Sequence, residues 1–167
     1  MRLFIAIELN QELRNTLKKI QQQLKAAGVR GNFTNQENLH VTLAFLGDYP
    51  DPDYVLDCMA SVPFESFRIT LDGFGQFGDL WWIGLEQNDA LNKYVKRLRN
   101  ALANAGIPFD RKKFAPHITL VRRASYIIRP EIIVPKSEMT VSRISLFRSD
   151  RGKNGMIYTE LGSIEAD

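Results

Sequence analysis

The sequence predicts an α+β fold with two similar lobes, because one pattern of strand, helix and loop occurs twice within its 167 residues. Each copy of the pattern ends in a strand that carries the motif His-x-Thr, first at His40 and Thr42 and again at His117 and Thr119. The chain has only these 2 histidines, and they lie 77 residues apart. A pseudo-twofold relation between the copies would place the two motifs opposite each other across a central cleft.

The first copy begins with an apolar, β-branched stretch at residues 3–9, which is typical of a mostly buried strand. Asn10 can cap the helix that follows, and Gly28 can end it in the left-handed conformation that favours glycine. An irregular stretch, residues 29–38, leads to His40. The apolar residues of this helix recur at steps of 4, 3 and 4, which places them on one face: Leu13, Leu17, Ile20 and Leu24.

The second copy repeats this order, with a strand at residues 80–86, a cap at Asn88 or Asp89 and a closing glycine at Gly106. The step from the first helical leucine to the closing glycine is 15 residues in both copies, and the step from that glycine to the histidine is 12 and then 11. The helical apolar residues again recur at steps of 4, 3 and 4: Leu91, Val95, Leu98 and Leu102. The two histidines therefore occupy equivalent places in a duplicated β-α-β unit.

The remaining elements are shorter, and no low-complexity segment or long linker separates them, so we expect residues 1–167 to form a single domain. They are a short helix through Val62 after the turn-rich residues 49–54, a strand at 67–74, and a closing hairpin of residues 139–149 and 156–162 around the turn at 150–155.

Composition is typical of a soluble globular protein, with 44% hydrophobic and 25% charged residues. The net charge of +3 suits an anionic ligand but is far from that of a polybasic tail. The single Cys58 cannot form an internal disulfide, which favours a reducing compartment. Because the sequence shows neither a signal peptide nor a membrane span, we expect a cytoplasmic protein. We also expect a monomer.

The two motifs suit acid–base chemistry. Residues at i and i+2 of a strand share a face, so each strand presents an imidazole and a hydroxyl together. Two imidazoles on opposite sides of one atom can act as base and acid, which suits in-line displacement at phosphorus. The hydroxyls of Thr42 and Thr119 can donate to the phosphoryl oxygens, and neither a metal nor a cofactor is required.

Three alternatives remain open at this point. A half-buried strand can carry a hydrogen-bonded histidine that has no chemical role. A zinc site of His40, His117 and Cys58 has only two obvious ligands, because Cys58 has no partner at ligand spacing. A serine hydrolase is disfavoured, since the chain has no G-x-S-x-G motif.

The chain resembles the 2H phosphoesterase superfamily, and within it the RNA 2′,3′-cyclic phosphodiesterases, which are also called 2′-5′ RNA ligases. The resemblance covers essentially the whole chain and is carried by "RLFIAIEL" at the start, "NLHVTLAFLG" around His40, "FAPHITLVRRAS" around His117 and the closing "ISLFRSD…YTEL". It implies a bilobal, pseudo-twofold fold in which two antiparallel sheets flank a central cleft and helices pack outside.

The resemblance also implies an activity and a division of labour. Such an enzyme opens a terminal 2′,3′-cyclic phosphate of RNA to a 2′-phosphomonoester without a metal. By motif, His40 would be the proton donor to the leaving 3′ oxygen and His117 the proton acceptor that activates water. Thr42 and Thr119 would hold the phosphate. Partners would be RNA with a 2′,3′-cyclic phosphate end, tRNA halves included, or cyclic nucleotides, and the reverse reaction would be 2′-5′ ligation.

Two further candidates lie in the same phrases. Arg122 matches a basic position after the second motif, where its fork suits a phosphate, although a solvated arginine is the alternative. Phe45 is a candidate for stacking on the terminal base, with core packing as the alternative. Residues 111–113, Arg123 and Arg148 are candidates for a basic rim along the RNA.

Other functions stay open beside this one. Neighbouring branches of the superfamily cleave 2′-5′ oligoadenylate or trim the 3′ ends of small RNAs, and a phosphodiesterase for small cyclic nucleotides is a related alternative. A non-catalytic nucleotide- or RNA-binding module is an alternative of another class. The presence of both histidines and both threonines argues against it, because binding alone does not need two imidazoles.

Overall fold

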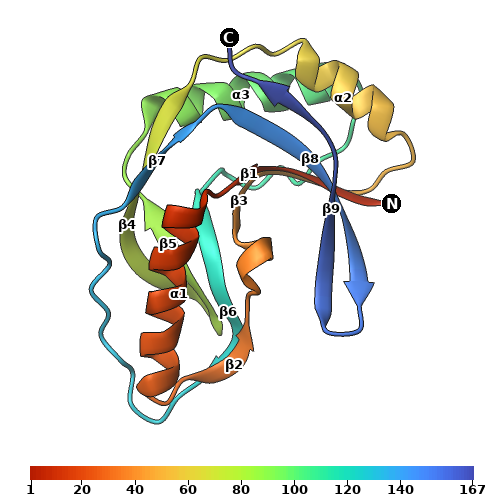
Figure 1. Cartoon of the computed structure of the whole chain (residues 1–167). Helices are drawn as coiled ribbons and strands as arrows, with labels where there is room; N and C mark the ends of the chain where they lie inside the picture. Colours follow the sequence, from red (N-terminus) through yellow and green to blue (C-terminus); the bar gives the residue numbers. More distant parts are fainter.

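The computed structural model describes residues 1–167 and contains two antiparallel sheets with helices on their outer faces (Figure 1). This architecture confirms the predicted α+β fold. One sheet, here called the β1 sheet, has the strand order β3-β1-β8-β9, and the other, the β6 sheet, has the order β2-β6-β5-β4-β7. In chain order the elements are β1 (Arg2–Glu8), α1 (Gln11–Ala26), β2 (Arg30–Phe33), the 3-10 helix η1 (Gln36–Asn38), β3 (His40–Asp48), α2 (Pro52–Ala60), β4 (Phe67–Phe77), β5 (Leu80–Leu85), α3 (Asp89–Asn104), β6 (His117–Ser125), β7 (Glu138–Val141), β8 (Arg143–Gly152) and β9 (Gly155–Glu165).

The two strands of each duplicated unit pair with one another, whereas the helix between them packs on the opposite lobe. β1 pairs with β3 in the β1 sheet, and β5 pairs with β6 in the β6 sheet. The intervening helix α1, however, contacts β6 and β7, and α3 contacts β3. Figure 1 shows α1 lying against the β4–β5–β6 side of the molecule and α3 lying over the other sheet. The units therefore exchange their helices.

The helix ends follow the predicted signals. The side-chain oxygen of Asn10 accepts a hydrogen bond from the Leu13 backbone N–H, and Asn88 does the same for Leu91. Asn88 rather than Asp89 is thus the cap of α3. Gly28 and Gly106 follow α1 and α3 with φ of 92° and 72°, which is the conformation that disfavours a side chain.

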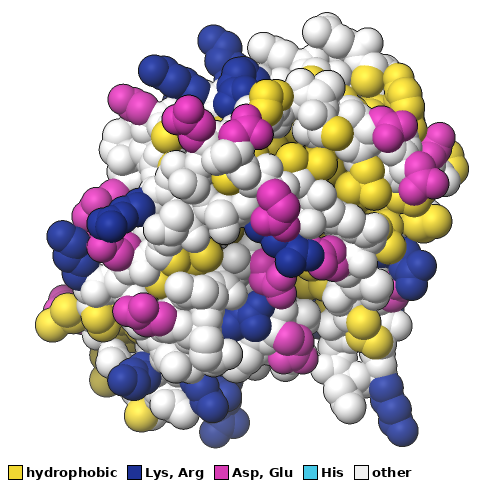
Figure 2. Space-filling view, turned by 45° about the horizontal axis from the view of Figure 1, so that its top comes forward, with side chains coloured by type: hydrophobic (Ala, Val, Ile, Leu, Met, Phe, Trp, Pro, Cys, Tyr) yellow, Lys and Arg dark blue, Asp and Glu magenta, His cyan; other side chains and the backbone are white.

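The apolar stripes of both helices are fully buried in a hydrophobic cluster of 35 residues to which both sheets contribute. A second, small cluster of Phe4, Ala6 and Phe147 lies apart from it, with Tyr158 packed against it. Figure 2 shows basic and acidic side chains interspersed over the face it draws, in keeping with the small net charge of +3. None of the helices is both long and apolar enough to span a membrane.

Two predicted boundaries are wrong. Residues 29–38, expected to be irregular, contain β2 and η1, and β2 gains regular pairing only because the edge of β6 lies beside it. Residues 139–141 do not belong to the closing hairpin, because they form β7, which pairs with β4 in the β6 sheet. The chain changes sheets at Ser142, and the hairpin is β8–β9. A continuous β-prone stretch gives no local signal for such a change of partner.

A bulge interrupts each histidine strand just after its threonine. The register of β3 against β1 skips Leu43, and that of β6 against β5 skips Leu120, so that each of these leucines and the residue after it are buried together. One extra residue reverses the alternation of faces that follows. Phe45 and Arg122 therefore come back to the face that carries the histidine and threonine of their strand.

The bulge of β6 also lies close to β2. A Cβ atom on Gly31 would lie 2.8 Å from the Arg122 carbonyl oxygen and 2.8 Å from the Val121 side chain. Gly31→Ala should therefore destabilise the protein by roughly 1–3 kcal/mol, as overpacking commonly does. Urea denaturation would measure the change. Asn32→Ala, at the exposed neighbour, is the control and should change stability by less than about 0.5 kcal/mol. Equal, small effects would contradict this close approach.

Candidate active site

The structure brings both predicted motifs to one small cavity. β3 and β6 belong to different sheets but contact each other, and each begins with its histidine. The cavity, of about 90 Å³, therefore lies between the two lobes. It is lined almost entirely by polar side chains: Thr34, Asn38, His40, Thr42, His117, Thr119, Arg122 and Tyr158.

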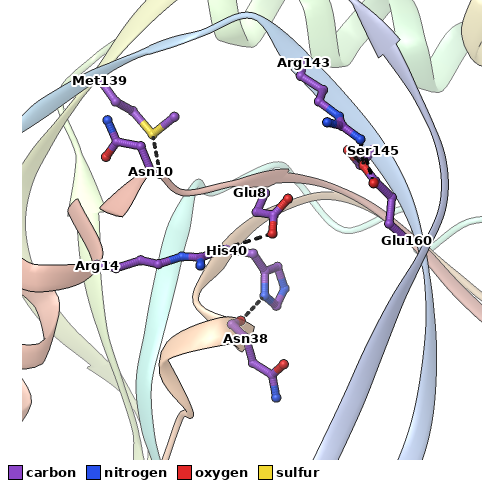
Figure 3. Close-up of polar contacts among 9 residues, drawn as sticks. All are labelled: Glu8, Asn10, Arg14, Asn38, His40, Met139, Arg143, Ser145 and Glu160. Atoms are coloured by element: carbon purple, nitrogen blue, oxygen red, sulfur yellow. Dashed lines mark hydrogen bonds and ion pairs between the residues drawn. The ribbon is translucent and has the colours of Figure 1, made fainter. Parts of the chain in front are cut away.

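Backbone carbonyls two residues upstream orient both imidazoles. Nδ1 of His40 lies 2.6 Å from the Asn38 carbonyl oxygen (Figure 3), and Nδ1 of His117 lies 2.7 Å from that of Ala115. A carbonyl oxygen only accepts, so each Nδ1 must carry the hydrogen. In both rings Nε2 is thus the nitrogen left for proton transfer.

The two Nε2 atoms differ in what they contact. Nε2 of His40 lies 2.9 Å from the Thr42 hydroxyl oxygen, which donates to it when the ring is neutral. His117 hydrogen-bonds the protein through Nδ1, which leaves its Nε2 free to accept a proton. The two rings are therefore oriented alike, but only His40 also hydrogen-bonds the protein through Nε2.

Aromatic rings flank both imidazoles. Phe4 and Tyr158 lie 5.0 and 5.4 Å from the His40 ring, with Tyr158 meeting it edge-on. Phe77 lies edge-on to His117 at 5.4 Å, and Trp82 lies 6.4 Å away. These contacts restrict ring rotation and keep water away from one side of each imidazole.

Burial lowers the pKa of His40 from its ordinary value. The hydrogen bond to the Asn38 carbonyl acts in the opposite direction, while the positive charge of Arg122 and the nearby His117 lower the pKa further. His40 is therefore neutral in the empty cavity at neutral pH. A negatively charged ligand close to its Nε2 would have the reverse effect.

Arg122 and Phe45 both face the cleft. Arg122 lines the small cavity and a larger groove beside it, of about 640 Å³, to which Phe45 also contributes. Phe45 is 36% exposed, so its alternative role in core packing is wrong. The guanidinium of Arg2 lies over the Phe45 ring at 5.4 Å.

The groove defines which basic residues surround the site. Arg123 lines it, together with Arg2 and Arg151, which no sequence pattern indicates. Arg148 instead pairs with Asp150 at 2.7 Å. Residues 111–113 are exposed and follow Asp110, whose backbone N–H donates to the Phe45 carbonyl.

Asn38, Thr34 and Tyr158 line the cavity although no sequence pattern indicates them. Asn38 acts through its carbonyl, and its side-chain amide donates to the Met156 carbonyl at 2.8 Å, which ties β9 to the loop before His40. Tyr158 lies on β9, more than a hundred residues from the first motif, so only the folded chain reveals its position.

Cys58, the third ligand that the zinc alternative would need, is not at the cavity. Cys58 lies on α2 within the main hydrophobic cluster and is 8% exposed. The structure contains no group of three or more His, Cys, Asp or Glu side chains arranged to hold a metal ion.

Two histidines and two threonines that pseudo-equivalent strands carry to one polar cavity are typical of a 2H phosphoesterase. A family model described as the 2′-5′ RNA ligase superfamily matches residues 9–153. The chain belongs to this family, as its resemblance implied.

Individual relatives are similar over nearly their whole length. A protein of Thermotoga maritima named RNA 2′,3′-cyclic phosphodiesterase is 34% identical, with 96% of this chain and 93% of that protein covered. A protein of Thermus thermophilus with the same name is 33% identical, with 96% and 88% covered. The crystal structure of E. coli LigT complexed with 3′-AMP has a TM-score of 0.84 at 28% identity and covers 99% of this chain and 97% of LigT.

The electrostatics of the cavity lead to a titration experiment. The pKa of His40, followed by NMR, should lie below 6.5 in the free protein. Arg122→Gln should raise it, because a positive charge that opposes protonation is removed. Saturating inorganic phosphate should also raise it. Arg148→Gln, which removes a charge paired outside the cavity, is the control and should leave it unchanged. A pKa that neither change moves would place Arg122 away from His40.

Proposed function

We propose that the protein hydrolyses the terminal 2′,3′-cyclic phosphate of RNA to a 2′-phosphomonoester by acid–base catalysis between its two histidines. The observation that carries this proposal is the convergence of two oriented imidazoles on one polar cavity without a carboxylate among its lining residues. The names of the Thermotoga and Thermus relatives support the choice of RNA 2′,3′-cyclic phosphodiesterase as the activity.

In the proposed reaction the phosphorus atom lies between the two Nε2 atoms. Nε2 of His117 takes a proton from water as the water oxygen attacks phosphorus. The bond from phosphorus to the 3′ oxygen breaks on the opposite side, and Nε2 of His40 gives its proton to that oxygen. The 2′ oxygen keeps its bond to phosphorus. Hydroxyls of Thr42 and Thr119 and the guanidinium of Arg122 donate to the remaining phosphoryl oxygens as negative charge builds there.

Binding of the substrate favours the protonated form of His40, which is the form that acts as the acid. His40 must be protonated before it can donate, yet burial and the charge of Arg122 keep it neutral in the empty cavity. A bound cyclic phosphate carries one negative charge a few ångströms from the ring, which raises the pKa of His40. Protonation of His40 is therefore coupled to binding of the phosphate.

The groove beside the cavity suits a terminal nucleoside and the backbone upstream of it. Phe45 offers a partly exposed ring on which any base can stack. Arg2, Arg123 and Arg151 line the same groove and suit backbone phosphates. LigT, a structural neighbour, was crystallised with 3′-AMP, a nucleotide with its phosphate on the 3′ oxygen.

The same two imidazoles serve 2′-5′ ligation, in which the 5′ hydroxyl of a second RNA replaces water as the nucleophile and a 2′-5′ linkage forms. His117 is then the base toward that hydroxyl, and His40 again gives its proton to the leaving 3′ oxygen. We further propose that the reaction uses no metal, and that the protein acts as a monomer in the cytoplasm. The single buried cysteine, which cannot form an internal disulfide, agrees with that compartment.

Hydrolysis of a cyclic-phosphate-ended RNA should continue at an unchanged rate in excess EDTA, and the product should be the 2′-phosphomonoester alone. The expected resistance follows from a mechanism in which imidazoles and hydroxyls supply every proton and donor. Phosphorus NMR or chromatography against 2′- and 3′-phosphate standards would identify the product. Loss of activity in EDTA with recovery on added zinc or manganese would contradict the metal-independent mechanism.

His40→Ala and His117→Ala should each lower kcat/KM by at least about 100-fold, because each removes one proton transfer. The double variant should be scarcely worse than the worse single one, since the two residues act as a unit. A phosphodiester with a nitrophenolate leaving group needs little help from an acid. It should therefore restore the rate of His40→Ala far more than that of His117→Ala.

Equal restoration of both variants would overturn the assignment of donor and acceptor while leaving the site in place. Full activity of either variant toward cyclic-phosphate-ended RNA would end the proposal. Circular dichroism of both variants provides the control for folding, and no loss of structure is expected because both rings border an open cavity.

A further inference from the structure

Two polar side chains interrupt the buried stripes of the exchanged helices at equivalent positions. Gln21 lies on α1 and is 5% exposed, next to the fully buried Ile20. Arg99 lies on α3, next to the fully buried Leu98, and is half-buried. Gln21 and Arg99 are 78 residues apart, as are Ile20 and Leu98, and this is also the offset between the apolar stripes of the two helices. The chemistry proposed above uses neither Gln21 nor Arg99.

Gln21 joins the second histidine strand to the loop before the first. Its side-chain nitrogen donates to the Leu120 carbonyl at 3.1 Å and to the Thr34 carbonyl at 2.9 Å. Leu120 is the bulged residue of β6, and its carbonyl also accepts from the Thr34 backbone N–H. Gln36 on η1 donates to the Gln21 side-chain oxygen at 3.2 Å, so every polar group of the amide is used.

Arg99 makes the reciprocal connection. Its Nε and one terminal nitrogen donate to the Leu43 carbonyl at 3.2 and 3.0 Å, and the other terminal nitrogen donates to the Lys112 carbonyl at 2.8 Å. Leu43 is the bulged residue of β3, and Lys112 lies in the loop before His117. Rings of Phe109 and Phe114, 5.8 and 5.5 Å from the guanidinium, hold the side chain in place.

The two connections are therefore equivalent under the internal repeat. Each ties the bulge of one His-x-Thr strand to the loop that delivers the histidine of the other strand. The bulges decide on which face Phe45 and Arg122 lie, and the loops contain the carbonyls of Asn38 and Ala115 that orient the imidazoles. Hydrogen bonds from buried and half-buried side chains of this kind fix geometry more than they add net stability.

We propose that Gln21 and Arg99 are positioning residues, which together set the separation and orientation of His40 and His117 across the cleft. They act through the two bulges and the two loops and do not touch the substrate. The proposal builds on the function proposed above, since it concerns the two groups that must lie on opposite sides of one phosphorus atom. A displacement of about 1 Å at such a site lowers a rate by as much as about 100-fold.

The test compares Gln21→Leu and Arg99→Met with two matched controls. Gln22→Leu changes the exposed neighbour on α1, and Arg97→Met removes a hydrogen bond from α3 that reaches only the Pro63 carbonyl. Both positioning variants should lower kcat for cyclic-phosphate-ended RNA by roughly 10- to 100-fold with KM changed less than about 3-fold. Arg99→Lys should recover part of the loss, because it retains one donor near the Leu43 carbonyl. The controls should keep wild-type rates.

Loss of stability has to be separated from loss of position. Leu17→Ala on α1 removes core packing without touching either connection, so it should lower Tm at least as much as Gln21→Leu yet keep kcat. If one positioning variant fails to fold, the other still tests the proposal, because the two connections are separate. A fall in kcat that simply follows Tm across all variants would overturn it.

A readout without RNA separates this proposal from the proposed function. The pKa of His40, followed by NMR, should change in Gln21→Leu and Arg99→Met, because the burial of the ring and its distances to Arg122 and His117 depend on how the two strands are placed. Affinity for inorganic phosphate should fall in the same variants and stay unchanged in Gln22→Leu and Arg97→Met. Unchanged titration and unchanged phosphate affinity would refute the positioning role, even if the wild-type protein hydrolyses cyclic phosphates. If the pKa of His40 and the phosphate affinity change as expected in these variants, but the wild-type protein does not hydrolyse cyclic phosphates, the proposed function is refuted and the positioning role is not.

Discussion

Burial of the apolar faces of α1 and α3 is the constraint on which the rest of the structure depends. α1 follows β1 of the β1 sheet but packs on β6 and β7, and α3 connects β5 and β6 of the β6 sheet but packs on β3, so both lobes contribute to the cluster of 35 buried residues. If the lobes separated, each sheet would lose a helix that packs on it. We therefore expect the lobes to fold as one cooperative unit, with the cleft held at a fixed width by the shared core.

The chemistry of the cleft depends on a local departure from regular strand geometry. Strict alternation would turn Phe45 and Arg122 away from the histidines, because each lies five positions, an odd number, after the histidine of its strand. One bulge in each strand corrects this, and bulges next to active sites commonly serve to redirect a side chain. The internal repeat places an aromatic ring and a guanidinium at equivalent positions, so the two halves of the cleft have become different in chemistry while remaining equivalent in geometry.

The features that sequence predicts well are those with local signals. Helix period, the Asn10 and Asn88 caps and the paired His-x-Thr strands all leave such signals, and each lies where it was expected. The exchange of helices, the bulges and the change of sheet at Ser142 have none, because they are decided by partners distant in the chain. For the same reason Tyr158 and the buried Gln21 were not foreseen, although a glutamine at a core position of an amphipathic helix is itself an irregularity that asks for a partner.

The exchange of helices bears on how such a chain could arise. One strand-helix-strand unit by itself would leave one apolar face of its sheet and the apolar face of its helix exposed to solvent. Two identical units bury both surfaces if the helix of each unit packs on the sheet of the other, as in a domain-swapped dimer. The present fold has the form that such a dimer would take once its two copies were joined end to end. After fusion the two halves could also change independently, so that one presents an aromatic side chain, Phe45, and the other a cationic side chain, Arg122, to the same cleft.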